Sequence, residues 1–363
     1  MKEYKILTIN PGSTSTKLAV FKGEECIYKD SINHSREELS AFTTNVHDQK
    51  DFRTNVILDS LQNSGIDLAD MDAIVGRCGF LPPPLISGTY IVDDHVCNTL
   101  EFRAVCQHAA NLGPVLAKNI GDKYGLPAYF VDSEAIIEVE PLSRISGHKG
   151  IDRRAYFHCL NAKAVARVVA EDMGKTYQDA NFVIAHMGGG ISASAHKNGR
   201  AIDCTCGLLG EGSFSPERAG TLGIQEVITM TLEETAAGAT REDMERVLNG
   251  KSGIYSYLGT ADAREVEKMI ESGNSEAKLI YEAMAYTISK DIAAMSSVLK
   301  GSVDAIILTG GLAHSKMLTG WIMERVSFIT KVIIVPGEIE SEAMVRGVTR
   351  VFNGIEELLV YEG

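Results

Sequence analysis

The chain has 363 residues, 45% hydrophobic and 23% charged, a composition typical of a globular protein of about two domains. It has 35 basic and 48 acidic residues, a formal charge of −13, which argues against nucleic-acid or anionic-membrane partners because both require a basic face. The seven cysteines lack zinc-site spacing, and no apolar run reaches the roughly 18 residues of a membrane span. Without a signal-like segment before Pro11, we expect a cytoplasmic protein.

The first 150 residues contain short β-rich runs and one helical stretch. The runs predict strands at 4–9, 18–22, 73–75 and 127–131, and apolar spacing predicts a helix over 104–123. Between the first two strands lies a turn of small residues, Asn10–Lys17.

The order of strand, glycine turn and strand recurs about 176 residues later. The second copy has strands at 182–185 and 191–196, joined by the turn 188–190. The pattern then predicts a long core helix, two more strands and a terminal helix, at 277–299, 305–308, 331–335 and from about 339. These elements indicate a duplicated α/β architecture with a central cleft between two domains. The expected domains are 1–150 and 151–340, with the terminal segment 341–363 packing back on the first.

The glycine turns are candidate phosphate sites. In the first turn, Gly12 lets backbone N–H groups approach an anion, Ser13 and Ser15 offer hydroxyls, and Lys17 adds charge. An ordinary Ser/Thr-rich turn is the alternative, but a second turn at 188–190 and a third at 310–311 favour phosphate binding. The stretch 250–252 is Gly-Lys-Ser, but the leading glycine of a Walker A loop is missing, and no dinucleotide fingerprint is present.

These turns and several other motifs, in the same order, resemble the acetokinase family of the actin/Hsp70/sugar-kinase superfamily. The motifs are Asn10–Lys17, Gly76-Arg77, Val131-Asp132, Phe157-His158, His186–Gly190, Pro216–Arg218 and Thr309–Gly311. The resemblance implies a ribonuclease H-like fold, a homo-oligomer, and phosphoryl transfer from ATP with Mg²⁺ to a short-chain carboxylate, giving ADP and an acyl phosphate. The greatest similarity is to kinases of butyrate, and kinases of branched acids such as isobutyrate or isovalerate are the alternative.

The resemblance also implies roles for individual residues. Arg77 holds the substrate carboxylate, Arg218 contacts the transferring phosphoryl group, and His158, which follows Arg153 and Arg154, stabilises the transition state. Mg²⁺ is oriented by Asp132 and by Glu342, with Glu340 as the alternative to Glu342. The residues implied to bind nucleotide are Asn10, Gly12, Ser13, Ser15, Lys17, His186, Gly188, Gly189, Gly190, Asp262, Arg264, Gly310, Gly311 and Leu312.

These residue types suit the chemistry. A carboxylate is already ionised at neutral pH, so the reaction requires no general base; it requires positive groups and positioning to bring two anions together. The sequence departs from acetate kinases, which have Asn at Gly189 and Ser315 and Val at Gly79. We expect Gly79 to leave room for a longer acyl tail beside Phe80, each buried CH₂ contributing about 0.8 kcal/mol.

Two other classes of protein have this fold. An ATP-driven, chaperone-like binding module would lack the trio Arg77, Arg218 and His158 and would carry a peptide-binding extension. A scaffold without activity would have lost charged catalytic residues. The trio is present in this chain, so the sequence favours the kinase.

Overall fold

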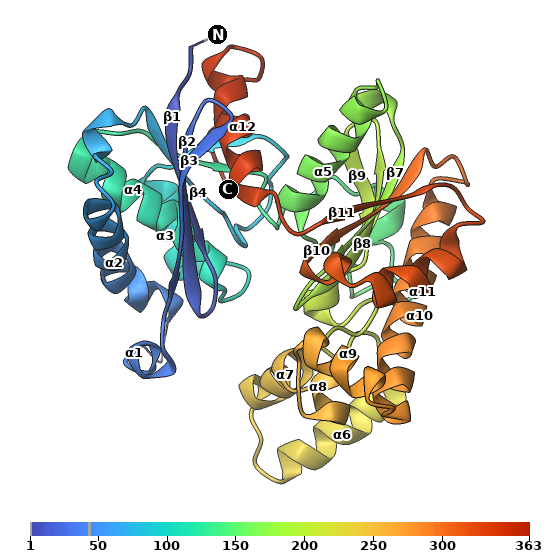
Figure 1. Ribbon diagram of the computed structural model, residues 1–363. Coiled ribbons are helices and arrows are strands. Elements are labelled where there is room, and N and C mark those ends of the chain that lie inside the picture. Colours follow the sequence, from blue (N-terminus) through green and yellow to red (C-terminus); the bar gives the residue numbers. More distant parts are fainter. Residues whose placement is uncertain (1, 43–44) are drawn as a thin grey trace. The chain divides into compact units, whose positions relative to one another are not determined.

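The computed structural model describes residues 2–42 and 45–363, which form two α/β units (Figure 1). Unit 1 contains the residues up to Ile137 together with Ile339–Gly363, and unit 2 is Glu138–Glu338. The first boundary therefore lies earlier than the expected residue 150. The reason is that the segment after it bonds to unit 2: the Glu138 carboxylate pairs with Lys163, and the Glu140 N–H donates to Ile202.

In the described part of unit 1 the strands form one six-stranded sheet in the order β3-β2-β1-β4-β6-β5. β1 pairs antiparallel with β2 and parallel with β4, and β4 is parallel to β6. Arg77 directly follows β4. Because Ile9 of β1 pairs with Gly76, the last residue of β4, Arg77 lies at the same end of the sheet as Asn10. The strands are β1 (Lys5–Pro11), β2 (Ser15–Lys22), β3 (Glu25–Asn33), β4 (Ala73–Gly76), β5 (Thr89–Ile91) and β6 (Ala128–Val131).

Helices cover both faces of this sheet: α2 and α4 lie on one face and α12 on the other (Figure 1). The helix expected over 104–123 begins only at Leu112. Its first residues form a loop because the Asn111 amide donates to Cys106 and accepts from the Phe80 N–H. The helices are α1 (Arg36–Ser40), α2 (Lys50–Asn63), α3 (Asp94–Arg103), α4 (Leu112–Tyr124) and α12 (Glu340–Phe352).

Unit 2 repeats the same sheet plan. Its described strands have the order β11-β10-β7-β8-β9, which matches β6-β4-β1-β2-β3 of unit 1 position for position. The pairings also match, since β7, β8 and β9 are antiparallel and β10 is parallel to β7 and β11. The strands are β7 (Phe182–Met187), β8 (Ile191–Lys197), β9 (Arg200–Cys204), β10 (Ala305–Gly310) and β11 (Val332–Pro336). The repeat seen in the sequence is therefore a repeat of topology.

The long helix α10 forms the centre of the unit 2 core. Its side chains Tyr281, Met284, Ile288 and Ile292 are fully buried against the sheet and α11, and burial of each such apolar side chain is worth about 1.5–3 kcal/mol. α5 contacts the sheet through β7 and β10, and α6–α9 form an insertion between β9 and α10. The helices are α5 (Cys159–Asp172), α6 (Ile224–Ala236), α7 (Arg241–Gly250), α8 (Gly253–Leu258), α9 (Ala263–Glu271), α10 (Ser275–Val298) and α11 (Lys316–Val326).

Among the helices of residues 2–42 and 45–363, none combines the length and apolar character that crossing a bilayer demands.

Candidate functional site

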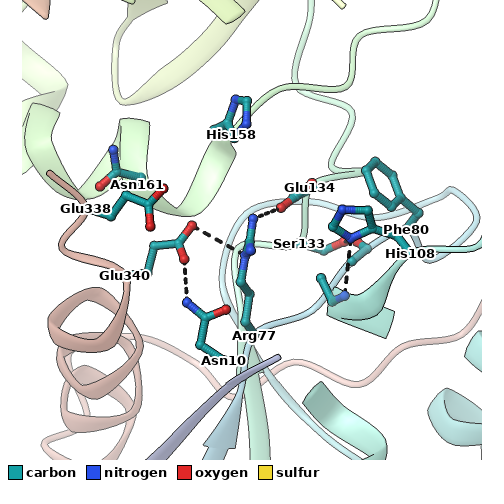
Figure 2. Close-up of polar contacts among 12 residues, drawn as sticks. Asn10, Arg77, Phe80, His108, Ser133, Glu134, His158, Asn161, Glu338 and Glu340 are labelled. Atoms are coloured by element: carbon teal, nitrogen blue, oxygen red, sulfur yellow. Dashed lines mark hydrogen bonds and ion pairs between the residues drawn. The ribbon is translucent and has the colours of Figure 1, made fainter. Parts of the chain in front are cut away.

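In unit 1 the polar side chains gather around Arg77, which follows the buried strand β4. Figure 2 shows its guanidinium between two carboxylates, Glu134 and Glu340. Nε lies 3.4 Å from Glu340 Oε1, and Nη2 donates to Glu134 Oε1. Asn10 Nδ2 donates to the other Glu340 oxygen at 2.6 Å. Arg77 is thus a nearly buried planar donor, a geometry suited to binding a carboxylate or phosphate.

Of the two carboxylates expected as alternatives near the metal, Glu340 rather than Glu342 contacts the group around Arg77. Glu340 is 4% exposed and contacts both Arg77 and Asn10. Residues two apart on a helix point to different sides, so Glu342 cannot face the same groups from α12. The sequence left these two carboxylates as alternatives, and the geometry favours Glu340.

Asp132 ends β6 with its backbone in the left-handed region, at a φ of 44°. Its Oδ1 accepts from the Ser87 hydroxyl and, at 3.0 Å, from the Gly88 N–H. These donors fix the carboxylate, which is buried. Such an oriented carboxylate fits a water-mediated role toward Mg²⁺, a cation that retains several waters and takes one or two protein carboxylates. The described residues contain no group of three or more His, Cys, Asp or Glu side chains that could hold a metal ion.

The turn between β1 and β2 is anchored from inside the protein by Arg53, a residue that sequence reasoning missed. Arg53 is fully buried and donates to the Ser15 carbonyl at 2.9 Å, to Thr16 Oγ1 at 3.0 Å and to the Ser13 carbonyl at 3.3 Å. Burial lowers its pKa to about 10. At the turn itself, Gly12 N–H donates to the Ser15 carbonyl at 2.8 Å. The sequence shows only that Arg53 can lie on a helix, and no motif in it indicates the contact between Arg53 and the turn.

The interpretation of Gly79 as space for an acyl tail is wrong. A Cβ on Gly79 would lie 2.2 Å from Asn111 Oδ1 and 3.0 Å from Asn111 N. The missing side chain therefore makes room for the buried Asn111, whose carbonyl accepts from the Phe80 N–H at 2.9 Å. Phe80 itself is 3% exposed and meets His108 edge to face, with ring centroids 5.4 Å apart (Figure 2).

In unit 2 the two predicted histidines stack on each other. The rings of His158 and His186 are nearly parallel, with centroids 3.8 Å apart. His158 Nδ1 lies 2.9 Å from Ser192 Oγ, and His186 Nδ1 lies 3.0 Å from Asn161 Nδ2. Because an amide nitrogen can only donate, His186 Nδ1 is the acceptor and Nε2 carries the proton of the neutral ring.

Arg153, which precedes His158 in the sequence, forms ion pairs elsewhere in unit 2. Its guanidinium pairs with Asp203 at 2.6 Å and with Glu211 at 2.5 Å. Arg154 is exposed. His158 is therefore placed by Ser192 and by the stacked ring of His186 rather than by the arginine pair.

The glycine turn after β7 contacts the predicted phosphoryl-binding arginine. A Cβ on Gly190 would lie 2.5 Å from Arg218 Nη1, so the guanidinium rests directly on the turn. Ser215 joins the two segments: its hydroxyl donates to the Gly189 carbonyl at 2.6 Å and accepts from the Arg218 N–H at 3.1 Å. The structure thus brings Gly188–Gly190 and Arg218 together within unit 2.

Unit 2 also contains a cavity of about 660 Å³, a size that suits a nucleotide. Six of the residues predicted to bind nucleotide line it, whereas His186, Gly190 and Gly310 of the same unit do not. The lining residues are Gly188, Gly189, Pro216, Glu217, Ala261, Asp262, Ala263, Arg264, Glu267, Gly311, Leu312, His314 and Ser315.

Asp262 and Arg264 are paired with each other at this cavity. Arg264 Nη2 lies 2.6 Å from Asp262 Oδ2, and hydrogen bonds from the Arg264 side chain and backbone lower the pKa of Asp262 to about 2. Glu267 is a cavity residue that sequence reasoning missed; it accepts from the Ser315 hydroxyl and, at 3.2 Å, from Tyr281. Glu267 lies one helical turn after Arg264, and this spacing is the feature of the sequence that could have indicated a residue facing the same cavity.

Gly310, the last residue of β10, and Gly311, which follows it, differ in why a glycine is present. Gly310 has a φ of 89°, and a Cβ there would lie 2.4 Å from the Met187 carbonyl. It also exchanges backbone hydrogen bonds with Gly337 at 2.9 and 3.0 Å. A Cβ on Gly311 would meet nothing within 4 Å. Gly310 is therefore required by the sheet, whereas Gly311 presents an open backbone surface to the cavity.

Two solved carboxylate kinases have the same fold as this chain. The structure superposes on acetate kinase from Porphyromonas gingivalis with a TM-score of 0.76 at 21% identity, covering 96% of this chain and 100% of that one. For a propionate kinase from Francisella tularensis the TM-score is 0.73 at 18% identity, covering 95% and 98%. The chain thus has the duplicated two-domain fold of the actin and sugar-kinase superfamily that the motifs implied.

The sequence comparisons identify the family. The model of the acetokinase family matches residues 142–331. A probable butyrate kinase from Listeria innocua is 44% identical over 359 residues, 99% of each chain. The chain belongs to the acetokinase family, and it is a phosphotransferase that acts on a carboxylate.

Proposed function

We propose that this protein transfers the γ-phosphoryl group of ATP to a short-chain carboxylate, with butyrate as the preferred acid. Butanoate and ATP give butanoyl phosphate and ADP. The observation that carries the proposal is Arg77, a guanidinium 15% exposed at the carboxyl end of a buried strand, where an external carboxylate can be held. The name of the Listeria innocua relative supports the choice of a four-carbon acid.

The reaction is one displacement at phosphorus. A carboxylate oxygen forms a bond to the γ-phosphorus, the bond from that phosphorus to the β–γ bridging oxygen breaks, and ADP leaves with the electron pair. In unit 1, Arg77 binds and orients the acid. In unit 2, Arg218 and the backbone N–H groups of Gly189 and Gly190 bind the transferring group, and the ring of His158 stabilises the charge that spreads over its oxygens.

The nucleotide occupies the unit 2 cavity in this proposal. Gly311 and Leu312 line the base and ribose, and Asp262 accepts from ribose hydroxyls. A divalent metal, which we propose is Mg²⁺, would be held through water by Asp132 and Glu340. When bound, it neutralises charge on the phosphate oxygens.

The test is a hydroxamate assay for acyl phosphate with ATP, Mg²⁺ and straight and branched acids of two to six carbons. We expect kcat/KM to be highest for butyrate and to fall by about fourfold for each CH₂ removed, as apolar burial predicts. Higher kcat/KM for isobutyrate or isovalerate would assign the branched acids instead. Absence of acyl hydroxamate with every acid would refute the kinase.

An arginine substitution locates the acid site. Arg77→Gln should raise the KM for the acid by about a hundredfold, because a charge-assisted bidentate contact is lost. Arg325→Gln removes a partly buried arginine that pairs with Glu282 at 2.9 Å, and it serves as the matched control. Equal behaviour of the two variants would contradict the role of Arg77.

We further propose a homo-oligomer in the cytoplasm. Helix α6 exposes an apolar stripe at i, i+4 and i+8, formed by Ile224, Ile228 and Leu232, whose exposed fractions are 76%, 49% and 67%. A stripe of this kind marks an interaction surface. Light scattering coupled to size exclusion measures the mass, and a monomer would refute the oligomer. The seven cysteines, all within the described residues, are free thiols, which suits a reducing compartment.

A further inference from the structure

The guanidinium that the proposed function assigns to the substrate carboxylate already holds a carboxylate of the chain itself. Arg77 Nη2 is paired with Glu134 Oε1, and the two side chains are 15% and 10% exposed (Figure 2). Glu340 stands on the other side, with Oε1 3.4 Å from Arg77 Nε. A third carboxylate added to this group would lie close to two existing negative charges, and repulsion would oppose its binding.

The two carboxylates around Arg77 are held to different degrees. Glu340 is 4% exposed, accepts from Asn10 Nδ2 at 2.6 Å, and occupies the first turn of α12, where the helix dipole favours a negative charge. Glu134 lies in a turn after β6, outside any helix or strand. Within residues 2–42 and 45–363, its side chain has one hydrogen-bonding partner, which is Arg77. Glu134 is therefore the carboxylate that can leave.

We propose that Glu134 is an internal competitor of the substrate: its carboxylate occupies the position on Arg77 that the acid takes, and the acid binds by displacing it. This inference rests on the proposed function. Glu134 thereby sets the affinity of the enzyme for its acid. Because the competition concerns only the carboxylate end, it weakens the binding of every acid by the same factor, whatever the length of the tail.

The position of Glu134 in a turn allows its side chain to leave the pair. The side chain is buried, at 10% exposed, but it can rotate away from Arg77 without breaking a ladder of the sheet. Arg77, by contrast, follows β4 directly, and its N–H donates to the Ile9 carbonyl at 2.9 Å. The backbone of the arginine stays in place while the carboxylate moves.

The experiment compares the wild-type enzyme with Glu134→Gln and Glu134→Ala. Gln keeps the size of the side chain and removes its charge, and Ala removes both. We expect the KM for acetate, propionate and butyrate to fall by about tenfold in each case, the value of one hydrogen bond to a charged group. The KM for ATP and the kcat should stay within about twofold of the wild-type values. Glu356→Gln, which removes a carboxylate paired with Arg350 at 2.6 Å in the same unit, is the matched control.

Four outcomes would overturn the inference. A raised KM for the acid would mean that Glu134 orients Arg77 for catalysis, and an unchanged KM would mean that it does not compete. Variants that fail to fold, judged by their melting curves, would show a structural role incompatible with a displaceable group. A change that differs among the three acids would place Glu134 against the tail instead. Failure of the proposed function looks different, since the wild-type enzyme itself would then form no acyl phosphate.

Discussion

The turn between β1 and β2 in unit 1 and the turn between β7 and β8 in unit 2 occupy equivalent places in the repeated sheet, yet they are stabilised in opposite ways. The first exposes hydroxyls and is held from inside by the buried Arg53. The second consists of three glycines and is held from outside by Ser215 and Arg218. The two units thus share the position of the turn, but the residues that stabilise it differ between them.

Removing the internal support should have the largest effect. Arg53→Met removes the guanidinium donor from the Ser13 and Ser15 carbonyls, the second of which keeps the Gly12 N–H, and we expect the free energy of unfolding to fall by about 3 kcal/mol. The KM for ATP should rise as well, because the turn loses its shape. Denaturant unfolding and steady-state kinetics measure the two effects. Arg241→Met, at a side chain that is 84% exposed, should change stability by less than about 0.5 kcal/mol. Equal changes in both variants would mean that the turn does not depend on Arg53.

Disturbing the external support should affect catalysis rather than stability. In Gly190→Ala the new Cβ would lie 2.5 Å from Arg218 Nη1, so the guanidinium must move. We expect kcat to fall by about a hundredfold, as when one donor to a transition-state oxygen is lost. The melting temperature should change little, because the end of a flexible side chain can shift. Gly320→Ala in α11, where a Cβ meets nothing within 4 Å, is the control. An unchanged kcat in Gly190→Ala would remove Arg218 from the proposed site.

The units also differ in their buried histidines. Burial, followed by the charges of Lys163 and Arg167, lowers the pKa of His196 to about 3. His34 in unit 1 has its pKa lowered by burial and by Arg53. A histidine neutral in the folded state contributes stability above its unfolded pKa of about 6.5, and this contribution is lost as the pH falls.

For His196 the loss should approach about 1.4 kcal/mol per pH unit below pH 6.5. His196→Gln should remove this part of the slope, as measured by urea unfolding at pH 5, 6 and 7. The same substitution at His34 should flatten the slope less. If wild type and His196→Gln lose stability in parallel on acidification, then His196 is not held neutral in the folded state.

Much of the fold was readable in the sequence because it depends on local pattern. The strand at 73–75 and the glycine turn 188–190 were located from apolar runs and glycines alone. The start of α4 was predicted too early. The loop before this helix is held by the side chain of Asn111, whose partners are distant in sequence or do not follow helical spacing. Such side-chain contacts leave no periodic signal.

The site residues divide in the same way. Arg77 and Arg218 were found through motifs, and their roles remain proposals. Arg53 and Glu134 were missed because their importance arises from where the chain folds back, 38 residues from Ser15 in one case and 57 residues from Arg77 in the other. The sequence left Glu342 and Glu340 as alternatives because sequence order does not fix which face of a helix meets a neighbour.

The path of the chain through the two units has a consequence for biosynthesis. Unit 2 is one continuous segment, Glu138–Glu338, so it can fold as soon as that segment has left the ribosome. Unit 1 must wait until Ile339–Gly363 has been synthesised, because α12 covers β1, β4 and β6, and Leu359 exchanges backbone hydrogen bonds with Thr89 and Ile91. Glu340 therefore reaches Arg77 only after all of unit 2 has been made, and a nascent chain lacks the completed anion site until then.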